Sequence, residues 1–172
     1  RLDGLIERPD PASRCQPLGP FGPSRVTDPR PPAKEGPWPG LALRDAILAE
    51  PDERDRSFDS IRSRIERFVS PGFTALRVRS SACPGFPFSI STSAGGPAGL
   101  KRMVGACHRR GLAVMLAVDL FGPGVEGDPL VSFGPYFAGR DRRFNLDGAR
   151  SDEVRRYFIE CAISWFREYR VD

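Results

Sequence analysis

Apolar side chains recur at helical spacing in three segments, which predict three helices. The first is expected to begin after a capping Ser57 and to stop at Ser70-Pro71-Gly72, with one apolar face: Phe58, Ile61, Ile65 and Phe68. The second has Pro97 in its first turn and Gly111 at its end, with these apolar positions: Leu100, Met103, Val104 and Cys107. The third is expected to be capped by Ser151 and to bury Val154, Phe158, Ala162, Trp165 and Phe166.

Three apolar runs between and before these helices predict strands. They cover residues 43–49, 74–78 and 112–120. The third run is nearly continuously apolar, which predicts burial on both faces, as in a parallel sheet. A long loop is expected over 121–150. The resulting alternation of strands and helices predicts βαβ units, and therefore an α/β fold with parallel strands.

The first 40 residues have a different character, because proline recurs throughout them. Proline removes backbone donors and fixes the backbone, so this leader is expected to be irregular. Such a segment links two domains or lies over one of them.

Composition and charge exclude several classes of protein. The chain has 26 basic and 22 acidic residues, and nearly all the basic ones are arginine. Because arginines alternate with acids over 52–56 and 152–156, we expect solvated, ion-paired helix faces and no nucleic-acid partner. No apolar run approaches the roughly 20 residues of a membrane span, so no membrane partner is expected.

Cysteine and histidine are scarce. The four cysteines, Cys15, Cys83, Cys107 and Cys161, include no closely spaced pair, so we expect no metal site and buried free thiols in a cytoplasmic protein. His108 is the only histidine. It is expected to be a helix-end side chain that interacts with the terminal carbonyl groups, and no cofactor is expected.

Several irregular blocks resemble a known family. The leader holds Pro-Asp-Pro-Ala-Ser-Arg at 9–14 and Gly-Pro-Ser-Arg-Val-Thr-Asp-Pro at 22–29. Further blocks lie at 95–102, 106–112, 133–137 (Phe-Gly-Pro-Tyr-Phe), 145–148 and 151–159. Together they resemble the malto-oligosyltrehalose trehalohydrolases, α-amylase-type enzymes of glycoside hydrolase family 13, along nearly the whole chain.

The resemblance implies a fold and a parent activity. Residues 1–40 would be a linker that follows a missing N-terminal β-sandwich, and 41–172 an incomplete (β/α) barrel. That segment would be the first three βα units of a TIM-type barrel, degenerate and truncated. The parent activity is hydrolysis of the α-1,4-glucosidic bond that releases trehalose from malto-oligosyltrehalose.

The chain departs from the family pattern where the family's site lies. Residues 47–55 are charged and broken by Pro51, so the first strand is expected to be short. The Trp-Gly-Tyr-Asp motif after the second strand is missing. The third strand ends in 116–123 in place of Asp-Val-Val-Tyr-Asn-His, which leaves Asp119 as the candidate substrate-binding residue. For Glu126 and Asp128, which also follow a strand end, a surface-loop role is expected.

The resemblance also bears on catalysis. Retaining glycosidases need two carboxylates about 5 Å apart, and the family pattern puts them after Asp172. No catalytic residue is therefore expected in this chain, and we expect it to be inactive by itself. Open sheet edges predict marginal stability, association, or dependence on a missing C-terminal barrel half.

Two other functions remain open from the sequence. A non-catalytic α-glucan-binding or interaction module would stack sugars on exposed aromatic residues: Trp38, Phe86, Phe88 and Tyr136. Its partner would be a malto-oligosaccharide or another α-glucan, and saturable binding of maltoheptaose would distinguish it from an inert segment. Nonspecific binding of anionic polymers by arginine would instead show a steep salt dependence.

Overall fold

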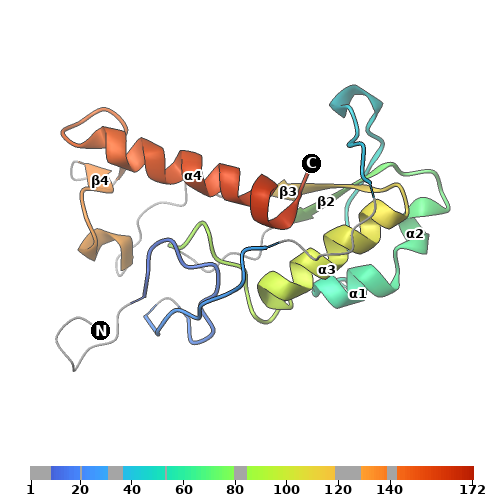
Figure 1. The fold of residues 1–172 in the computed structure, drawn as a ribbon, viewed down its shortest axis with the longest axis horizontal. Coiled ribbons are helices and arrows are strands. Elements are labelled where there is room, and N and C mark those ends of the chain that lie inside the picture. Colours follow the sequence, from blue (N-terminus) through green and yellow to red (C-terminus); the bar gives the residue numbers. More distant parts are fainter. Residues whose placement is uncertain are drawn as a thin grey trace.

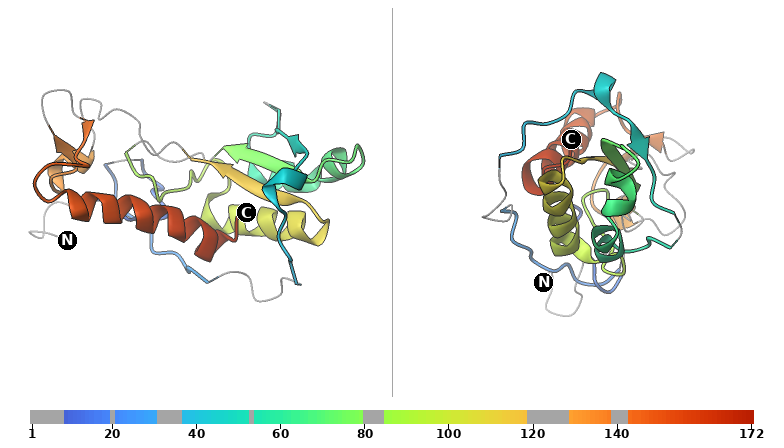
Figure 2. Two further views of the ribbon diagram at one scale, coloured as in Figure 1. Left: turned by 90° about the horizontal axis from the view of Figure 1, so that it is seen from above. Right: turned by 90° about the vertical axis from the view of Figure 1, so that its right-hand side faces the viewer.

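Three short parallel strands form the sheet of the computed structural model, in the order β1–β2–β3 (Figures 1 and 2). They are β1 (Leu48–Ala49), β2 (Ala75–Arg79) and β3 (Ala113–Ala117). Leu48 pairs with Ala75, and Ala75 pairs with Ala113. The structure describes residues 9–19, 21–30, 37–52, 54–79, 85–118, 129–138 and 143–172. Since consecutive strands are neighbours, each connection is a helical crossover, as the sequence predicts.

The helices lie in two groups. Helices α1 (Phe58–Ser63), α2 (Glu66–Val69) and α3 (Gly96–Arg109) lie with the sheet at one end of the molecule (Figure 1). Helix α4 (Ser151–Tyr169) extends from the sheet toward the other end. There a 3₁₀ turn (Pro129–Ser132) and the antiparallel pair β4 (Phe137–Ala138) and β5 (Arg143–Phe144) interrupt the predicted long loop.

Local signals predict the start of α1 correctly. The Ser57 hydroxyl accepts a hydrogen bond from the Ser60 backbone at 3.1 Å, and the Ser60 hydroxyl accepts one from the Ser57 backbone at 3.4 Å. This reciprocal pair satisfies two donors at the helix start. The predicted single helix nevertheless divides in two, because Arg64 leaves helical geometry at φ −118°.

Helix α3 also follows its sequence signals. It begins after Gly95, whose φ of +115° favours glycine, and Pro97 lies in its first turn. It ends before Gly111, which has a φ of +72°. A Cβ at Gly95 would meet the Phe58 ring at 3.5 Å, an ordinary van der Waals distance, so the backbone angle is what favours glycine there.

The hydrophobic core lies between the sheet and the helices. The side chains with no exposure there come from β2, α3, α4, β3 and the residue before β3: Leu76, Leu100, Met103, Val104, Cys107, Leu112, Val114 and Cys161. The same cluster includes Trp165 and Tyr169 from the last turns of α4. Alternate residues of β2, Leu76 and Val78, face this core, whereas Arg77 and Arg79 are exposed.

Two predicted strands are shorter in the structure. Residues 43–45 form a 3₁₀ turn with no buried side chain, so the predicted strand 43–49 is wrong except at Leu48 and Ala49. Pro51 lies two residues after the end of β1 and has no N–H to extend the ladder. In β3, Ala113 and Val114 are buried but the next three residues are half-buried. Burial on both faces is therefore confirmed only for the first part of this strand.

The predicted cap of α4 is wrong by one residue. Arg150 is the capping position, in left-handed geometry with φ 61°, and Ser151 is the first helical residue. The Ser151 hydroxyl accepts a hydrogen bond from Arg155 at 2.8 Å instead. Of the predicted apolar face, Val154, Phe158 and Trp165 are buried, whereas Phe166 is 58% exposed.

Candidate functional site

A hollow of about 600 Å³ lies at the carboxyl ends of β1 and β2. Barrel enzymes have their active sites at this end of the strands. We call it the sheet-end hollow. Its charged lining consists of Glu50, Asp52, Asp55, Arg56, Arg77 and Arg79. The start of α1 closes its other side with Ser57 and Phe58.

Each carboxylate that lines the sheet-end hollow is ion-paired with an arginine. Glu50 is ion-paired with Arg77, and Asp52 with Arg67 at 3.5 Å. The Asp55 side chain is only 1% exposed and is ion-paired with Arg64 at 3.1 Å and Arg67 at 3.8 Å. A backbone hydrogen bond from Arg54 is the main cause that lowers the pKa of Asp52. A general acid needs a raised pKa, so Asp52 does not suit that role.

The predicted substrate-binding residue, Asp119, lies outside the described residues, as do Glu126 and Asp128. The described part of this segment ends at Val118, just after β3. The role of Asp119 therefore stays a prediction, as do the surface-loop roles of Glu126 and Asp128.

The aromatic residues proposed to stack on sugars are buried or pack against other side chains of the protein. Phe86 is 1% exposed and Phe88 is 4% exposed, so the interpretation of both as exposed platforms is wrong. Phe88 is covered by the Arg14 guanidinium at 4.7 Å from its ring. Trp38 is stacked on His108 at 4.5 Å, and Tyr136 makes an edge contact with another tyrosine ring. These contacts are explained by core and loop packing.

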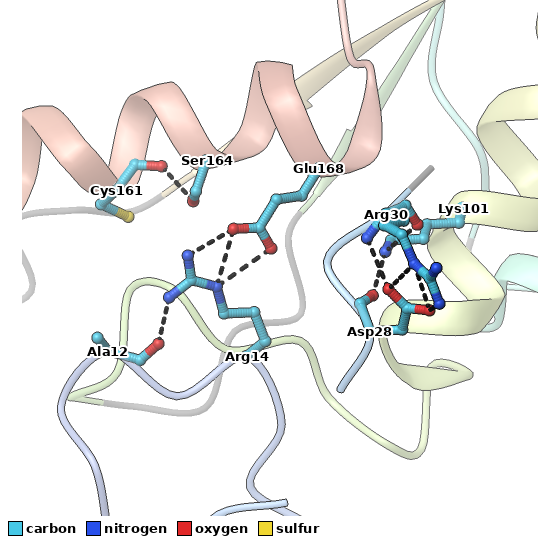
Figure 3. A network of polar contacts seen from close by, with 8 residues as sticks. All are labelled: Ala12, Arg14, Asp28, Arg30, Lys101, Cys161, Ser164 and Glu168. Atoms are coloured by element: carbon cyan, nitrogen blue, oxygen red, sulfur yellow. Dashed lines mark hydrogen bonds and ion pairs between the residues drawn. The ribbon is translucent and has the colours of Figure 1, made fainter. Parts of the chain in front are cut away.

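The family-like motif at 9–14 attaches the leader to α4 (Figure 3). The Arg14 guanidinium donates to Glu168 with bonds of 2.5 and 3.2 Å, and to the Ala12 carbonyl at 2.6 Å. The Tyr157 hydroxyl of α4 donates to the Pro11 carbonyl at 2.8 Å. The sequence gives no sign of this contact, since Arg14 and Glu168 are 154 positions apart.

A second attachment joins the end of the leader to the end of α3. The Asp172 carboxylate accepts a hydrogen bond from the Trp38 indole at 2.6 Å and lies 2.9 Å from His108 Nε2. The Val114 backbone also donates to it at 2.9 Å. The polar partner of His108 is therefore this carboxylate, and the expected contact with the terminal helix carbonyls is wrong because the ring turns toward the chain end.

The Asp172 attachment makes stability dependent on pH. Burial by itself would raise the pKa of Asp172, but hydrogen bonds from His108, Val114 and Trp38 hold it below its ordinary value. Because the pKa of Asp172 is lowered in the folded chain, its ionised carboxylate stabilises the fold at pH values above the unfolded-state pKa of about 4. This contribution is lost as the pH falls below about 4. We expect Asp172→Asn to cost about 1–2 kcal/mol at pH 7 in urea unfolding. The difference from the parent should shrink toward pH 3; a constant difference would contradict this.

The described cysteines are buried free thiols, as predicted: Cys15, Cys107 and Cys161. Cys83 lies outside the described residues. Burial raises the pKa of Cys107 to about 12 and that of Cys161 to about 11, so both are poor nucleophiles. The described residues contain no cluster of three metal-ligating side chains and no helix suited to cross a membrane. The cytoplasmic location stays a prediction.

Solved structures give the class of fold. A proposed α-amylase from Salmonella typhimurium matches with a TM-score of 0.83 and 27% identity, over 96% of this chain and 31% of that one. A pullulanase from Paenibacillus barengoltzii, in complex with maltohexaose, matches with a TM-score of 0.73 over 95% of this chain. At 16% identity the latter shows the fold alone. The chain thus has the fold of an α/β segment of an α-amylase-type glycoside hydrolase. No protein-family model matches it.

Curated sequences give the family. Malto-oligosyltrehalose trehalohydrolase of Saccharolobus solfataricus is 31% identical over 190 residues, which cover 99% of this chain and 34% of that protein. The same enzyme of Mycobacterium tuberculosis H37Rv is 31% identical, and that of Arthrobacter ramosus 32%, again over 99% of this chain. The chain is therefore a relative of the malto-oligosyltrehalose trehalohydrolases, as its motifs indicated. It spans about a third of their length.

Proposed function

We propose that this chain is a segment of a trehalohydrolase-like glycoside hydrolase and is inactive by itself. In this proposal residues 41–172 form the first three βα units of a partial barrel, and 1–40 are the linker to a preceding domain. The parent reaction is cleavage of the α-1,4 bond that releases trehalose from malto-oligosyltrehalose. The observation that carries the proposal is the match of 99% of the chain to about a third of each relative.

The sheet supports the barrel part of the proposal. Its strands are parallel and in sequence order, which is the arrangement of successive βα units. At the free edge of β3, the Asp172 backbone donates to the Val114 carbonyl at 2.8 Å. A strand that continues from Asp172 would thus lie next to β3, where a fourth parallel strand belongs.

The site chemistry supports inactivity. In the sheet-end hollow, Glu50, Asp52 and Asp55 are committed to ion pairs. The alignment to the Saccharolobus relative runs over 190 residues although the chain has 172, so the chain lacks residues that the relative has. In this proposal the lost residues belong to the site-forming loops, because the Trp-Gly-Tyr-Asp motif of one such loop is missing.

Trehalose release tests the proposed inactivity. The purified chain is incubated with maltotriosyltrehalose, with the Saccharolobus relative as the positive control. We expect trehalose from the relative and none from this chain above the buffer blank. Trehalose release that increases in proportion to the concentration of this chain would overturn the proposal.

The coding DNA beyond Asp172 tests whether the chain is a segment of a longer hydrolase. A reading frame that continues with a Gly-Leu-Arg-Leu-Asp-Ala-like strand would support it, because that strand carries the family's nucleophile. A stop codon directly after Asp172 would mean that the chain is a catalytically inactive fragment, and any function would then have to be binding or scaffolding.

A further inference from the structure

A cavity of about 870 Å³ lies between the leader and the first turns of α3, apart from the sheet-end hollow. Leader residues 25–30 line one side, and the start of α3 lines the other. We call it the leader cavity. Its volume lies within the roughly 300–1,000 Å³ of small-molecule sites. Two segments that resemble the family, the leader and the start of α3, therefore enclose this cavity. The proposed parent reaction gives the cavity no role.

The charged lining of the leader cavity is mainly positive. It holds four cations, Arg25, Arg30, Lys101 and Arg102, and one carboxylate, Asp28. Arg30 is ion-paired with Asp28 at 2.6 Å, and Arg102 with Asp59 at 3.4 Å. Within the described residues, Arg25 and Lys101 have no carboxylate at ion-pair distance. Arg25 and Lys101 thus have no direct ion-pair partner there, although Glu168 and Asp28 favour the charged form of Lys101 from farther away.

Lys101 is the buried member of this pair. It is 7% exposed, and its ammonium group donates to the Asp28 carbonyl at 2.6 Å and the Arg30 carbonyl at 2.9 Å (Figure 3). An ammonium has three donors, so these two bonds leave one, and the same group lies 5.5 Å from the centroid of the Tyr169 ring. Burial lowers the pKa of Lys101, which means that the charged form is incompletely stabilised in the protein alone. A bound anion would supply that stabilisation.

Helix α3 adds a weaker attraction from the same side. Gly95, Gly96, Pro97 and Ala98 line the cavity at the positive end of the helix dipole. The first turn contains no acidic side chain to neutralise it. At Gly96 an added Cβ would meet nothing within 4 Å, whereas its N–H already donates to the Ser91 carbonyl at 3.0 Å.

We propose that the leader cavity binds the phosphate group of a small organic phosphate. A phosphomonoester carries about −1.5 to −2 charges at neutral pH, which suits a lining with four cations and one carboxylate. Arg25 and Lys101 would contact the phosphate oxygens beside the start of α3. The cavity exceeds the volume of a phosphate ion, which leaves room for the organic part. This site is independent of the proposed segment function.

Isothermal titration of the chain with glucose 6-phosphate, inorganic phosphate and glucose tests the proposal. We expect saturable binding of both phosphates and none of glucose. Tighter binding of glucose 6-phosphate would assign the site to an organic phosphate, whereas equal affinities would assign it to the free ion. Amide resonances of Gly95, Gly96 and Ala98 should shift during the titration, which locates the ligand at α3.

Matched variants separate the cavity from general attraction to arginine. Arg25→Gln should weaken phosphate binding by about tenfold, the effect of losing one charge-assisted contact. Arg25 is exposed, so the fold should tolerate this change. Arg110→Gln removes the same charge at the other end of α3 and should leave affinity unchanged. Equal loss in both variants, or no saturation by either phosphate, would overturn the site.

Discussion

Replacing Leu76 with alanine is expected to lower the free energy of unfolding by about 3 kcal/mol. Leu76 lies in β2, the central strand, with no exposed surface, and it belongs to the core that α3 and β3 also form. Truncation removes buried apolar area and leaves a cavity that the surrounding strands and helices cannot fill. Urea unfolding followed by circular dichroism measures the change.

The control for this prediction is Leu43→Ala. Leu43 is 73% exposed in the 3₁₀ turn before β1, so the same chemical change should cost less than about 0.5 kcal/mol. Similar losses at both positions would mean that β2 is not the centre of a packed core.

Replacing Arg14 with methionine is expected to cost about 2 kcal/mol, the second largest effect. The change leaves the Glu168 carboxylate, 14% exposed, without its guanidinium partner. It also removes the cation over the Phe88 ring. A double-mutant cycle with Glu168→Gln should show coupling, because the pair is largely shielded from water.

An exposed ion pair of the leader provides the comparison. In Arg30–Asp28 the side chains are 84% and 55% exposed, so Arg30→Met should cost less than about 1 kcal/mol. If Arg14→Met cost no more than this control, the leader would not be held on α4 by Arg14.

The parts of the fold that sequence predicts are those decided by neighbouring residues. Ser57 and Ser60 cap α1 within a single turn, and Gly95 and Gly111 bound α3 by their own backbone preferences. The apolar spacing of α3 predicts its buried face because that spacing is a property of the helix itself. The parallel order of the strands follows from the lengths of the connections.

The parts that sequence does not predict depend on distant residues. Whether Phe88 is exposed depends on Arg14, and the polar partner of His108 depends on the position of Asp172. Leu43 has the apolar character of a strand residue, but no neighbour buries it. The sequence does not predict the leader cavity for the same reason, since Arg25 and Lys101 line one cavity only in the folded chain.

The attachments of the leader also set an order for events during synthesis. Arg14 must wait for Glu168, 154 positions later, and Trp38 must wait for Asp172, 134 positions later. At about 5–20 residues per second, a ribosome needs on the order of 10 s to supply these partners. Until then the Phe88 ring lacks the cation that covers it, and Arg14 lacks its carboxylate partner. The leader is therefore attached to the rest of the fold only after both α4 and Asp172 have been synthesised.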